Sequence, residues 1–232
     1  SRWTADNIYP VGKMAFDIEL DEGTYTSVST IDMVYGNPDS CAGCQTGVEH
    51  IYAIGNNTND RNLYYSLDGG LTWSVLAFGT NANLTLTALG LAGNNLIATF
   101  GESANPGGYY LSVIDSATGI PGTPTKVTIG VTSGEVINDI FVLSPRKVFF
   151  AADDGKIYKS TNFAGRVVLA ESGSTSDNFT RLDGVPASGG GTIMVAGTFG
   201  QDVFYSLDGG DTWTQTSGSP LGAVTAVAVL SN

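Results

Sequence analysis

The sequence predicts an all-β protein that folds as a β-propeller of four to five blades, each an antiparallel sheet of four strands. Three observations predict it. A serine-marked motif recurs at intervals of 46, 48 and 46 residues, alternation of apolar and polar residues is frequent, and no segment sustains the spacing of an amphipathic helix. The 31 glycines among 232 residues fit short strands joined by many tight turns.

The motif is clearest in residues 65–73 and 205–213, which both read Tyr-Ser-Leu-Asp-Gly-Gly-x-Thr-Trp. Two further segments, residues 108–112 and 156–160, carry the same ending of an aromatic residue followed by serine. The same position in four repeats is therefore marked by four serines: Ser66, Ser112, Ser160 and Ser206.

Each repeat has room for four strands. An apolar strand precedes each serine-ended strand, another lies further upstream, and a Gly-rich turn and a fourth strand follow the serine. Four antiparallel strands in about 45 residues are typical of a propeller blade. The chain then divides into the end of a preceding or closing blade with an edge strand (1–26), four blades (27–80, 81–132, 133–176 and 177–221) and the first strand of a further or shared blade (222–232).

The segment Ser-x-Asp-Gly-Gly-x-Thr-Trp resembles the Asp-box (BNR) repeat. That repeat occurs in sialidase-like propellers, photosystem-assembly-factor-like propellers, sortilin-type receptors, some xyloglucan hydrolases and many bacteriophage structural proteins. Two copies are intact here, the copy after Ser160 is degraded and the copy after Ser112 is lost. The resemblance covers the chain from about residue 27 onward and implies the fold more strongly than the function.

The chemistry of this motif is structural. An Asp carboxylate can accept hydrogen bonds from turn amides, the glycines allow positive φ, and the Trp can pack beneath the hairpin between neighbouring blades. The residues expected in this role are Ser66, Asp68, Gly70, Trp73, Ser206, Asp208, Gly210 and Trp213.

Charge and hydropathy exclude several classes of partner. The 22 acidic residues against 10 basic ones give a formal net charge of −12. Nucleic acids and anionic membranes both require a cationic surface, so neither is an expected partner. No apolar run is long enough to span a bilayer, which predicts that the chain does not insert into a membrane.

The binding face of a propeller is built by the connections between second and third strands and by those that lead into the next blade. Two such connections here are rich in amide side chains, which suit hydroxyl-bearing ligands. The ligand-facing candidates are Asn57, Asp60, Arg61, Glu102 and Asn105. No aromatic residue accompanies these loops, so solvated loops are the simpler interpretation.

Enzymatic alternatives find little support in the sequence. A sialidase needs three clustered arginines, a Tyr–Glu pair and an Asp, whereas the five arginines here are scattered. Other hydrolases use paired carboxylates, for which Asp153, Asp154, Glu102 and Glu171 are available. Residues 153–155 are more simply a turn between two strands. The single histidine, His50, is expected at the surface. No cofactor and no metal site is predicted.

Cys41 and Cys44 form the most unusual local feature, a Cys-x-x-Cys in a long connection between first and second strands. A local disulfide, two free thiols and half of a metal site shared with another chain are all open. A disulfide would place the protein outside a reducing cytosol. Together with the resemblance to Asp-box proteins of bacteriophages, this implies an extracellular or virion location.

The two ends of the chain resemble parts of blades. Trp3 matches the last residue of the motif, and residues 224–229 match a first strand. Either these pieces close a fifth, incomplete blade, or further blades lie outside this sequence. Near the N-terminus, residues 14–20 alternate apolar and acidic or small residues, and the acids on one face favour a solvent-facing edge strand.

These observations predict a non-catalytic structural or recognition module of an extracellular or virion surface. Its partners would be other protein subunits or a glycan, contacted through loops. The alternatives are a carbohydrate-active enzyme whose catalytic residues lie partly outside this segment, and a lectin.

Overall fold

The computed structural model of the protein describes residues 31–36, 50–55, 62–78, 84–102, 105–133, 135–161, 167–171, 178–186, 191–200, 202–218 and 222–229. Regular structure in these ranges is entirely β. Nowhere in them does a helix occur that is long and apolar enough to cross a membrane.

Sixteen strands of the described part form four antiparallel sheets, each made of four strands that are consecutive in the chain. The first contains β1 (Ile31–Gly36), β2 (His50–Gly55), β3 (Asn62–Ser66) and β4 (Ser74–Ala77). The second contains β5 (Leu84–Ala92), β6 (Asn95–Glu102), β7 (Asn105–Val113) and β8 (Thr125–Ser133). The third contains β9 (Ile137–Ser144), β10 (Lys147–Ala152), β11 (Ile157–Ser160) and β12 (Val167–Glu171). The fourth contains β13 (Phe179–Pro186), β14 (Thr192–Thr198), β15 (Val203–Ser206) and β16 (Thr214–Gln215).

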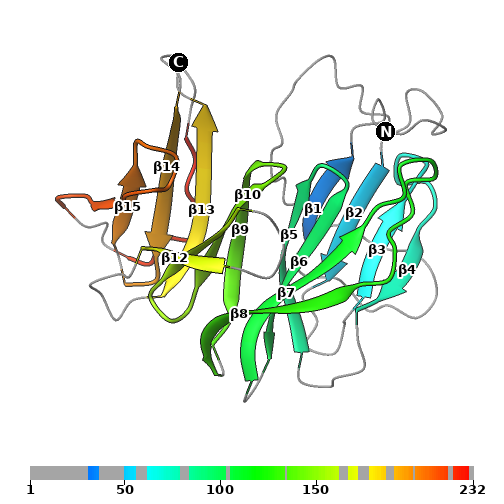
Figure 1. The fold of residues 1–232 in the computed structure, drawn as a ribbon, viewed down its shortest axis with the longest axis horizontal. Coiled ribbons are helices and arrows are strands. Elements are labelled where there is room, and N and C mark those ends of the chain that lie inside the picture. Colours follow the sequence, from blue (N-terminus) through cyan, green and yellow to red (C-terminus); the bar gives the residue numbers. More distant parts are fainter. Residues whose placement is uncertain are drawn as a thin grey trace.

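The sheets stand side by side and meet through their first strands (Figure 1). β1 contacts β5, β5 contacts β9, and β9 contacts β13. Successive four-stranded sheets whose first strands line a common axis are the blades of a β-propeller. The predicted fold class is confirmed.

The four repeat serines occupy one structural position. Three of them end the third strand of their sheet, Ser112 is the last residue but one of β7, and each is at most 1% exposed. Each pairs with a residue near the start of the second strand, and these partners are Ile51, Leu96, Val148 and Met194. The sequence repeat is therefore a repeat of sheet register.

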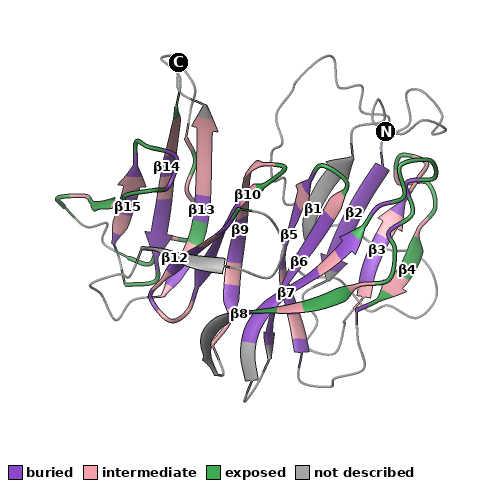
Figure 2. Ribbon diagram, viewed as in Figure 1, coloured by how far each residue is buried: buried purple, intermediate pink, exposed green. Residues whose placement is uncertain are grey.

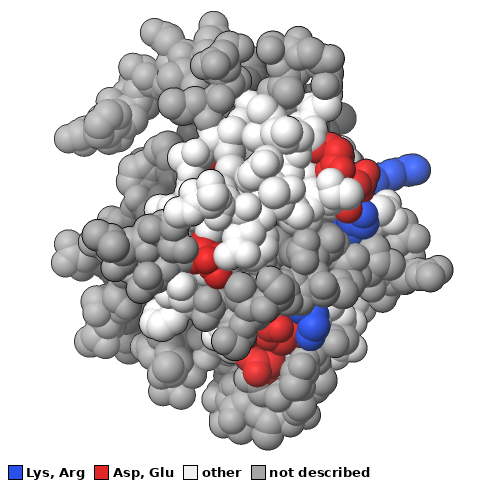
Figure 3. Space-filling model, turned by 90° about the vertical axis from the view of Figure 1, so that its left-hand side faces the viewer, with Lys and Arg blue, Asp and Glu red and all other residues white. Residues whose placement is uncertain are grey.

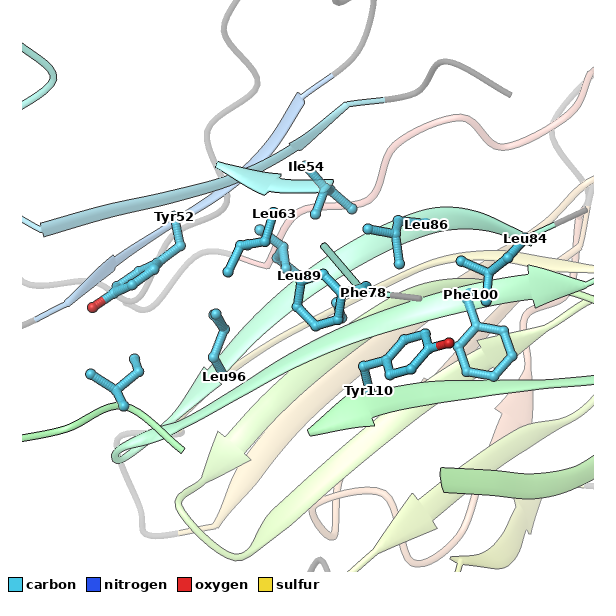
Figure 4. Packing of buried hydrophobic residues seen from close by; sticks show 12 residues of the cluster. Tyr52, Ile54, Leu63, Phe78, Leu84, Leu86, Leu89, Leu96, Phe100 and Tyr110 are labelled. Carbon is cyan, nitrogen blue, oxygen red and sulfur yellow. The ribbon is translucent and has the colours of Figure 1, made fainter. Parts of the chain in front are cut away.

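The core lies between sheets, in three apolar clusters that join the first sheet to the second, the second to the third and the third to the fourth (Figure 2). Figure 4 shows the first of these, where Tyr52 and Leu63 face Leu89, Leu96 and Phe100 of the second sheet. The second strands of the second and third sheets, β6 and β10, are covered on both faces. In β10, all five consecutive residues 148–152 are therefore apolar and 0% exposed. Such a strand shows no alternation in its sequence.

Neighbouring sheets are also joined by a repeated polar contact. The first strands β5, β9 and β13 each contain a register shift, at residues 87, 138 and 180. The side chain at each shift donates a hydrogen bond to a backbone oxygen of the next unit. Thr87 donates to Ile137, and Asn138 Nδ2 donates to Phe179 O over 2.7 Å. Bulges commonly re-aim a side chain in this way.

Candidate functional site

Each sheet has two ends with different chemistry. At the first, which we call the turn end, second strands turn into third strands and first strands begin. It includes residues 153–156 and 199–202. At the opposite hairpin end, third strands connect to fourth strands through residues 67–73, 114–124 and 207–213.

The hairpin of the first sheet is closed by Asp68. Its Oδ1 accepts hydrogen bonds from Ser66 Oγ (2.7 Å) and Thr72 N (2.9 Å), and its Oδ2 accepts one from Thr72 Oγ1 (2.6 Å). Ser66 Oγ in turn accepts from Gly70 N (2.8 Å). The hydrogen bonds from Thr72 and Ser66 lower the pKa of Asp68 to about 2. We call this arrangement, residues 66–73, a serine–aspartate turn.

Residues 206–213 of the fourth sheet form a second serine–aspartate turn with the same bonds. Asp208 accepts from Ser206 Oγ (2.7 Å), Thr212 N (2.9 Å) and Thr212 Oγ1 (2.6 Å), and additionally from Asp211 N (3.0 Å). Gly210 N donates to Ser206 Oγ (2.8 Å). The bonds from Thr212 hold the pKa of Asp208 well below its usual range. Both carboxylates are thus occupied by their own turns.

Two glycines in each serine–aspartate turn have positive φ: 73° and 91° at Gly69 and Gly70, and 72° and 81° at Gly209 and Gly210. This backbone conformation strains other residues. The second glycine of the fourth sheet has a further constraint, because a Cβ on Gly210 would overlap the ring of Phe149 in the third sheet. This hairpin therefore packs across the junction between two sheets.

An ion-pair network and a tryptophan strengthen the same junction. Asp211 Oδ1 lies 2.9 Å from Lys159 Nζ and 3.2 Å from Lys147 Nζ, both of the third sheet. Trp213 is half-buried against the cluster between the third and fourth sheets. Its Nε1 is buried and has no hydrogen-bond partner among the described residues. Trp73, the equivalent residue of the first sheet, is also half-buried.

The second sheet replaces the motif with a different closed loop. Ser112 Oγ donates to Gly122 O (2.6 Å), and Asp115 Oδ1 accepts from Ala117 N (2.7 Å). The loop lies on the first sheet, where Tyr52 Oη donates to Gly119 O (2.8 Å). The segment after Ser112 lacks the Asp-Gly-Gly motif, but it still forms a hairpin that contacts the preceding sheet.

The predicted surface position of His50 is wrong. His50 is 6% exposed, because Gly119 of the second sheet packs directly on its ring. Burial lowers the pKa of the imidazole. Sequence reasoning could not see this contact, since the loop that covers His50 lies nearly 70 residues further along the chain.

The turn end of the third sheet brings two acids, a lysine, a tyrosine and an asparagine together. Asn138 Nδ2 donates to Asp153 Oδ1, and Asp154 Oδ2 accepts from Lys156 Nζ (2.7 Å) and Tyr158 Oη (2.6 Å). Residues 153–155 form the predicted turn between β10 and β11. The sequence singled out both acids, but their partners Asn138 and Tyr158 were missed.

The surroundings of these two acids differ from those of the acids at the hairpin end. Burial raises the pKa of Asp153. The hydrogen bond from Asn138 opposes this rise, and the charge of the neighbouring Asp154 adds to it. The Asp154 side chain is 5% exposed, yet its Oδ1 has no hydrogen-bond partner among the described residues. A buried carboxylate oxygen without a partner is costly, so this turn is less stable than its hydrogen-bond capacity allows.

An exposed aromatic residue lies at the same end of the fourth sheet. Phe199, in the turn between β14 and β15, is 68% exposed, and its N–H donates to Asn178 O (2.9 Å). Asn138, which donates to Asp153, also donates to the backbone oxygen of Phe179, the residue after Asn178. Acids and aromatic ring are therefore both attached to the start of β13. The sequence analysis missed this aromatic residue; its only signal is a Phe beside Gly in a short connection.

Other predicted residues are placed only partly. Glu102 and Asn105 pair with each other across β6 and β7 at the turn end. The remaining loop candidates Asn57, Asp60 and Arg61, and the pair Cys41 and Cys44, lie outside the described residues. The described residues contain no group of three or more His, Cys, Asp or Glu side chains that could hold a metal ion.

Comparison with known proteins gives neighbours in structure only. No family model matches the chain, and no curated protein matches it. Similar solved structures include YCF48 from Cyanidioschyzon merolae (15% identity, 74% of this chain and 47% of that one, TM-score 0.46) and the GH74 enzyme of Niastella koreensis (17%, 87% and 29%, 0.49). A third is YCF48 bound to D1 peptide (14%, 90% and 71%, 0.45). The chain spans less than half the length of the first two.

Proposed function

We propose that the chain is a non-catalytic recognition module of an extracellular or virion surface, and that it binds a partner protein at the turn end of its third and fourth sheets. The observation that carries this proposal is the exposed ring of Phe199, on the sheet next to the acidic turn of Asp153 and Asp154. Aromatic faces and carboxylates both attract Lys and Arg side chains. The formal net charge of −12 favours a basic partner surface.

The closed serine–aspartate turns support the Asp-box assignment of the repeat. Their acids serve their own hairpins, which gives them a structural role. Arg146 lies in the turn between β9 and β10, at the hairpin end. Arg181 lies near the start of β13, at the opposite turn end. That separation is unlike the arginine cluster that a sialidase requires. A virion or surface protein without the catalytic set remains our choice within this family.

A carbohydrate-active enzyme is the second candidate, and one observation favours it. Asp153 has a raised pKa and lies beside a second acid, which is a property of proton donors in glycoside hydrolases. A panel of oligosaccharides incubated with the wild-type chain separates the two functions. Our proposal predicts no cleavage. Cleavage that disappears in both Asp153→Asn and Asp154→Asn would overturn it.

Binding is tested by selecting peptides from a displayed random library on the immobilised chain. We expect basic peptides whose affinity falls at least tenfold with Phe199→Ser. The matched control is Leu71→Ser, at an apolar residue of the hairpin end that is even more exposed than Phe199, and we expect it to change affinity less than twofold. Peptides that ignore Phe199, or a glycan array with strong hits and no selected peptide, would contradict a protein partner and favour the lectin alternative.

The location is tested through the two cysteines. We expect that Cys41 and Cys44 of the chain isolated from its natural source resist alkylation until a reductant is added, as a disulfide would. Immediate alkylation of both thiols would contradict an oxidising, extracellular environment.

A further inference from the structure

The single histidine of the chain lies beneath a loop that belongs to the next sheet. His50 begins β2, and Tyr52, two residues later on the same face of the strand, packs in the cluster between the first and second sheets. Residues 114–122, which follow β7, form the loop that covers His50, and we call them the cover loop. A Cβ on Gly119 of this loop would overlap Cε1 and Nδ1 of the imidazole.

The cover loop is closed by its own backbone hydrogen bonds. Asp115 N donates to Ile120 O (3.0 Å), Gly119 N donates to Asp115 O (2.8 Å), and Gly122 N donates to Val113 O (2.9 Å). Ile114 and Pro121 form a β-bridge at its base. These bonds do not involve the first sheet, so the loop can move away from that sheet without losing them.

The described attachment of the cover loop to the first sheet is small. Tyr52 Oη donates to Gly119 O (2.8 Å), and Gly119 also lies against Leu67 and the ring of His50. Residues 115–118, Ile120 and residue 122 are exposed. One hydrogen bond and the contacts of one glycine therefore carry most of the attachment that keeps His50 only 6% exposed.

The titratable groups around His50 come from four elements. On β2, burial raises the pKa of Tyr52, so its hydroxyl stays neutral, and β3 places Tyr65 opposite it. The hairpin after β3 contributes Asp68 and the cover loop contributes Asp115, and both carboxylates accept hydrogen bonds from their own turns. β1 pairs a glycine with His50. Burial is accordingly the effect that lowers the pKa of the imidazole.

The fourth sheet shows this end of a sheet where no loop of the described chain follows. By register, Ile193 and Leu207 are the equivalents of His50 and Leu67. Leu207 is 66% exposed and Ile193 is half-buried, whereas Leu67 is half-buried and His50 is buried. Figure 3 looks onto this side of the fourth sheet and shows a broad area without charged groups among the described residues. Removal of the cover loop would expose a comparable apolar area on the first sheet.

We propose that the cover loop is an acid-operated switch, which lies on the first sheet while the imidazole of His50 is neutral and lifts when the imidazole takes up a proton. A protonated ring enclosed by a glycine backbone and apolar atoms is deprived of its hydration. Lifting the loop restores that hydration and breaks one described hydrogen bond, which is a small loss. The lifted state uncovers Tyr52 and Leu67 at the hairpin end, away from the partner surface proposed at the turn end.

The direction of the switch follows from the lowered pKa of the buried imidazole. In the lifted state the ring has the ordinary histidine pKa of about 6.5, and in the closed state burial holds the pKa below that value. The stability of the closed state is therefore fully present above about pH 6.5 and is lost as the pH falls through the pKa of the closed state. Within that window the ratio of lifted to closed chain rises by up to about tenfold per pH unit.

The first test measures the pKa of His50 by NMR, where a single histidine needs no assignment. We expect a wild-type value below 6.5, a rise to about 6.5 in Gly119→Ala, which forces the loop off the ring, and a smaller rise in Tyr52→Phe. The matched control is Gly93→Ala, at another positive φ of the second sheet, and it should leave the pKa unchanged. A wild-type pKa of 6.5, no rise in either cover-loop variant, or an equal rise in Gly93→Ala would overturn the proposal.

The second test follows the movement itself through the nuclear Overhauser effect between His50 Hε1 and Gly119 Hα. We expect this cross-peak to fall at least threefold between about pH 8 and about pH 5, as His50 becomes protonated. The cross-peaks between Phe100 and Tyr110, whose ring centroids lie 5.2 Å apart in the same cluster, should persist. A His50–Gly119 cross-peak that survives protonation, or one that disappears together with those of Phe100 and Tyr110, would contradict the switch.

Discussion

At the hairpin end of the sheets, Asp68 and Asp208 each accept several hydrogen bonds from their own turns, and their pKa values lie below the usual range. At the turn end, Asp153 has a raised pKa, and one oxygen of Asp154 has no hydrogen-bond partner in the part of the chain that the structure describes. The same residue type therefore stabilises one end and adds unsatisfied charge to the other. Unsatisfied groups retained at one end of a stable framework are characteristic of binding sites.

The largest effect is expected from a single methyl group at the hairpin end. Gly210→Ala forces alanine to a φ of 81° and places a Cβ into the Phe149 ring. We expect a loss of about 2–4 kcal/mol in the free energy of unfolding, from backbone strain and overpacking together. Gly69→Ala, with φ of 73° and no atom within 4 Å of the new Cβ, should cost only about 1 kcal/mol. Equal losses in urea denaturation would show that the hairpin does not pack across the sheets.

Removing the charge of a serine–aspartate turn should have the next largest effect. Asp208→Asn replaces an acceptor of four hydrogen bonds, and we expect a loss of about 1–2 kcal/mol at pH 7, discounted for the exposure of the turn. Since the pKa is lower in the folded chain, this stabilisation is present above the ordinary aspartate pKa near 4 and is lost as the pH falls through the folded value. The variant should therefore show a weaker loss of stability between pH 4 and 2. An unchanged acid dependence would contradict the role of the carboxylate.

Asp211→Asn should have a smaller effect, because the ion pairs with Lys159 and Lys147 are partly exposed. We expect about 0.5 kcal/mol at low salt and almost none at 1 M salt, where exposed charges are screened. A loss that persists at high salt would indicate packing rather than charge.

The smallest effect, and the one of opposite sign, is expected at the turn end. Asp153→Asn keeps an acceptor for Asn138 and removes a buried charge beside Asp154. Because the folded pKa is raised, the carboxyl stabilises the chain only at low pH, and this contribution is lost as the pH rises through the folded value. At pH 7 the variant should equal the wild type or exceed it by less than about 1 kcal/mol. A clear loss at pH 7 would place Asp153 among the structural acids.

The fold could be predicted because the four strands of each sheet are consecutive in the chain, so the spacing of the repeat shows directly where they lie. The spacing of the four serines located four third strands, and each serine lies at the end of its strand or one residue before it. The site was harder to predict. Asp153 and Asp154 were visible as acids in a turn, but their partner Asn138 lies in a different strand, and the exposure of Phe199 depends on the packing of the fourth sheet. The burial of His50 was missed for the same reason, because a loop of the next sheet covers it.

The most direct test of this account is a carboxyl ¹³C NMR titration of the folded chain, with Asp68, Asp208 and Asp153 assigned by their Asn variants. The account predicts a pKa of about 2 for Asp68, a lowered pKa for Asp208 and a raised pKa for Asp153. Three values near the ordinary aspartate pKa of 3.8 would contradict it, because the two ends of the sheets would then not differ in their chemistry.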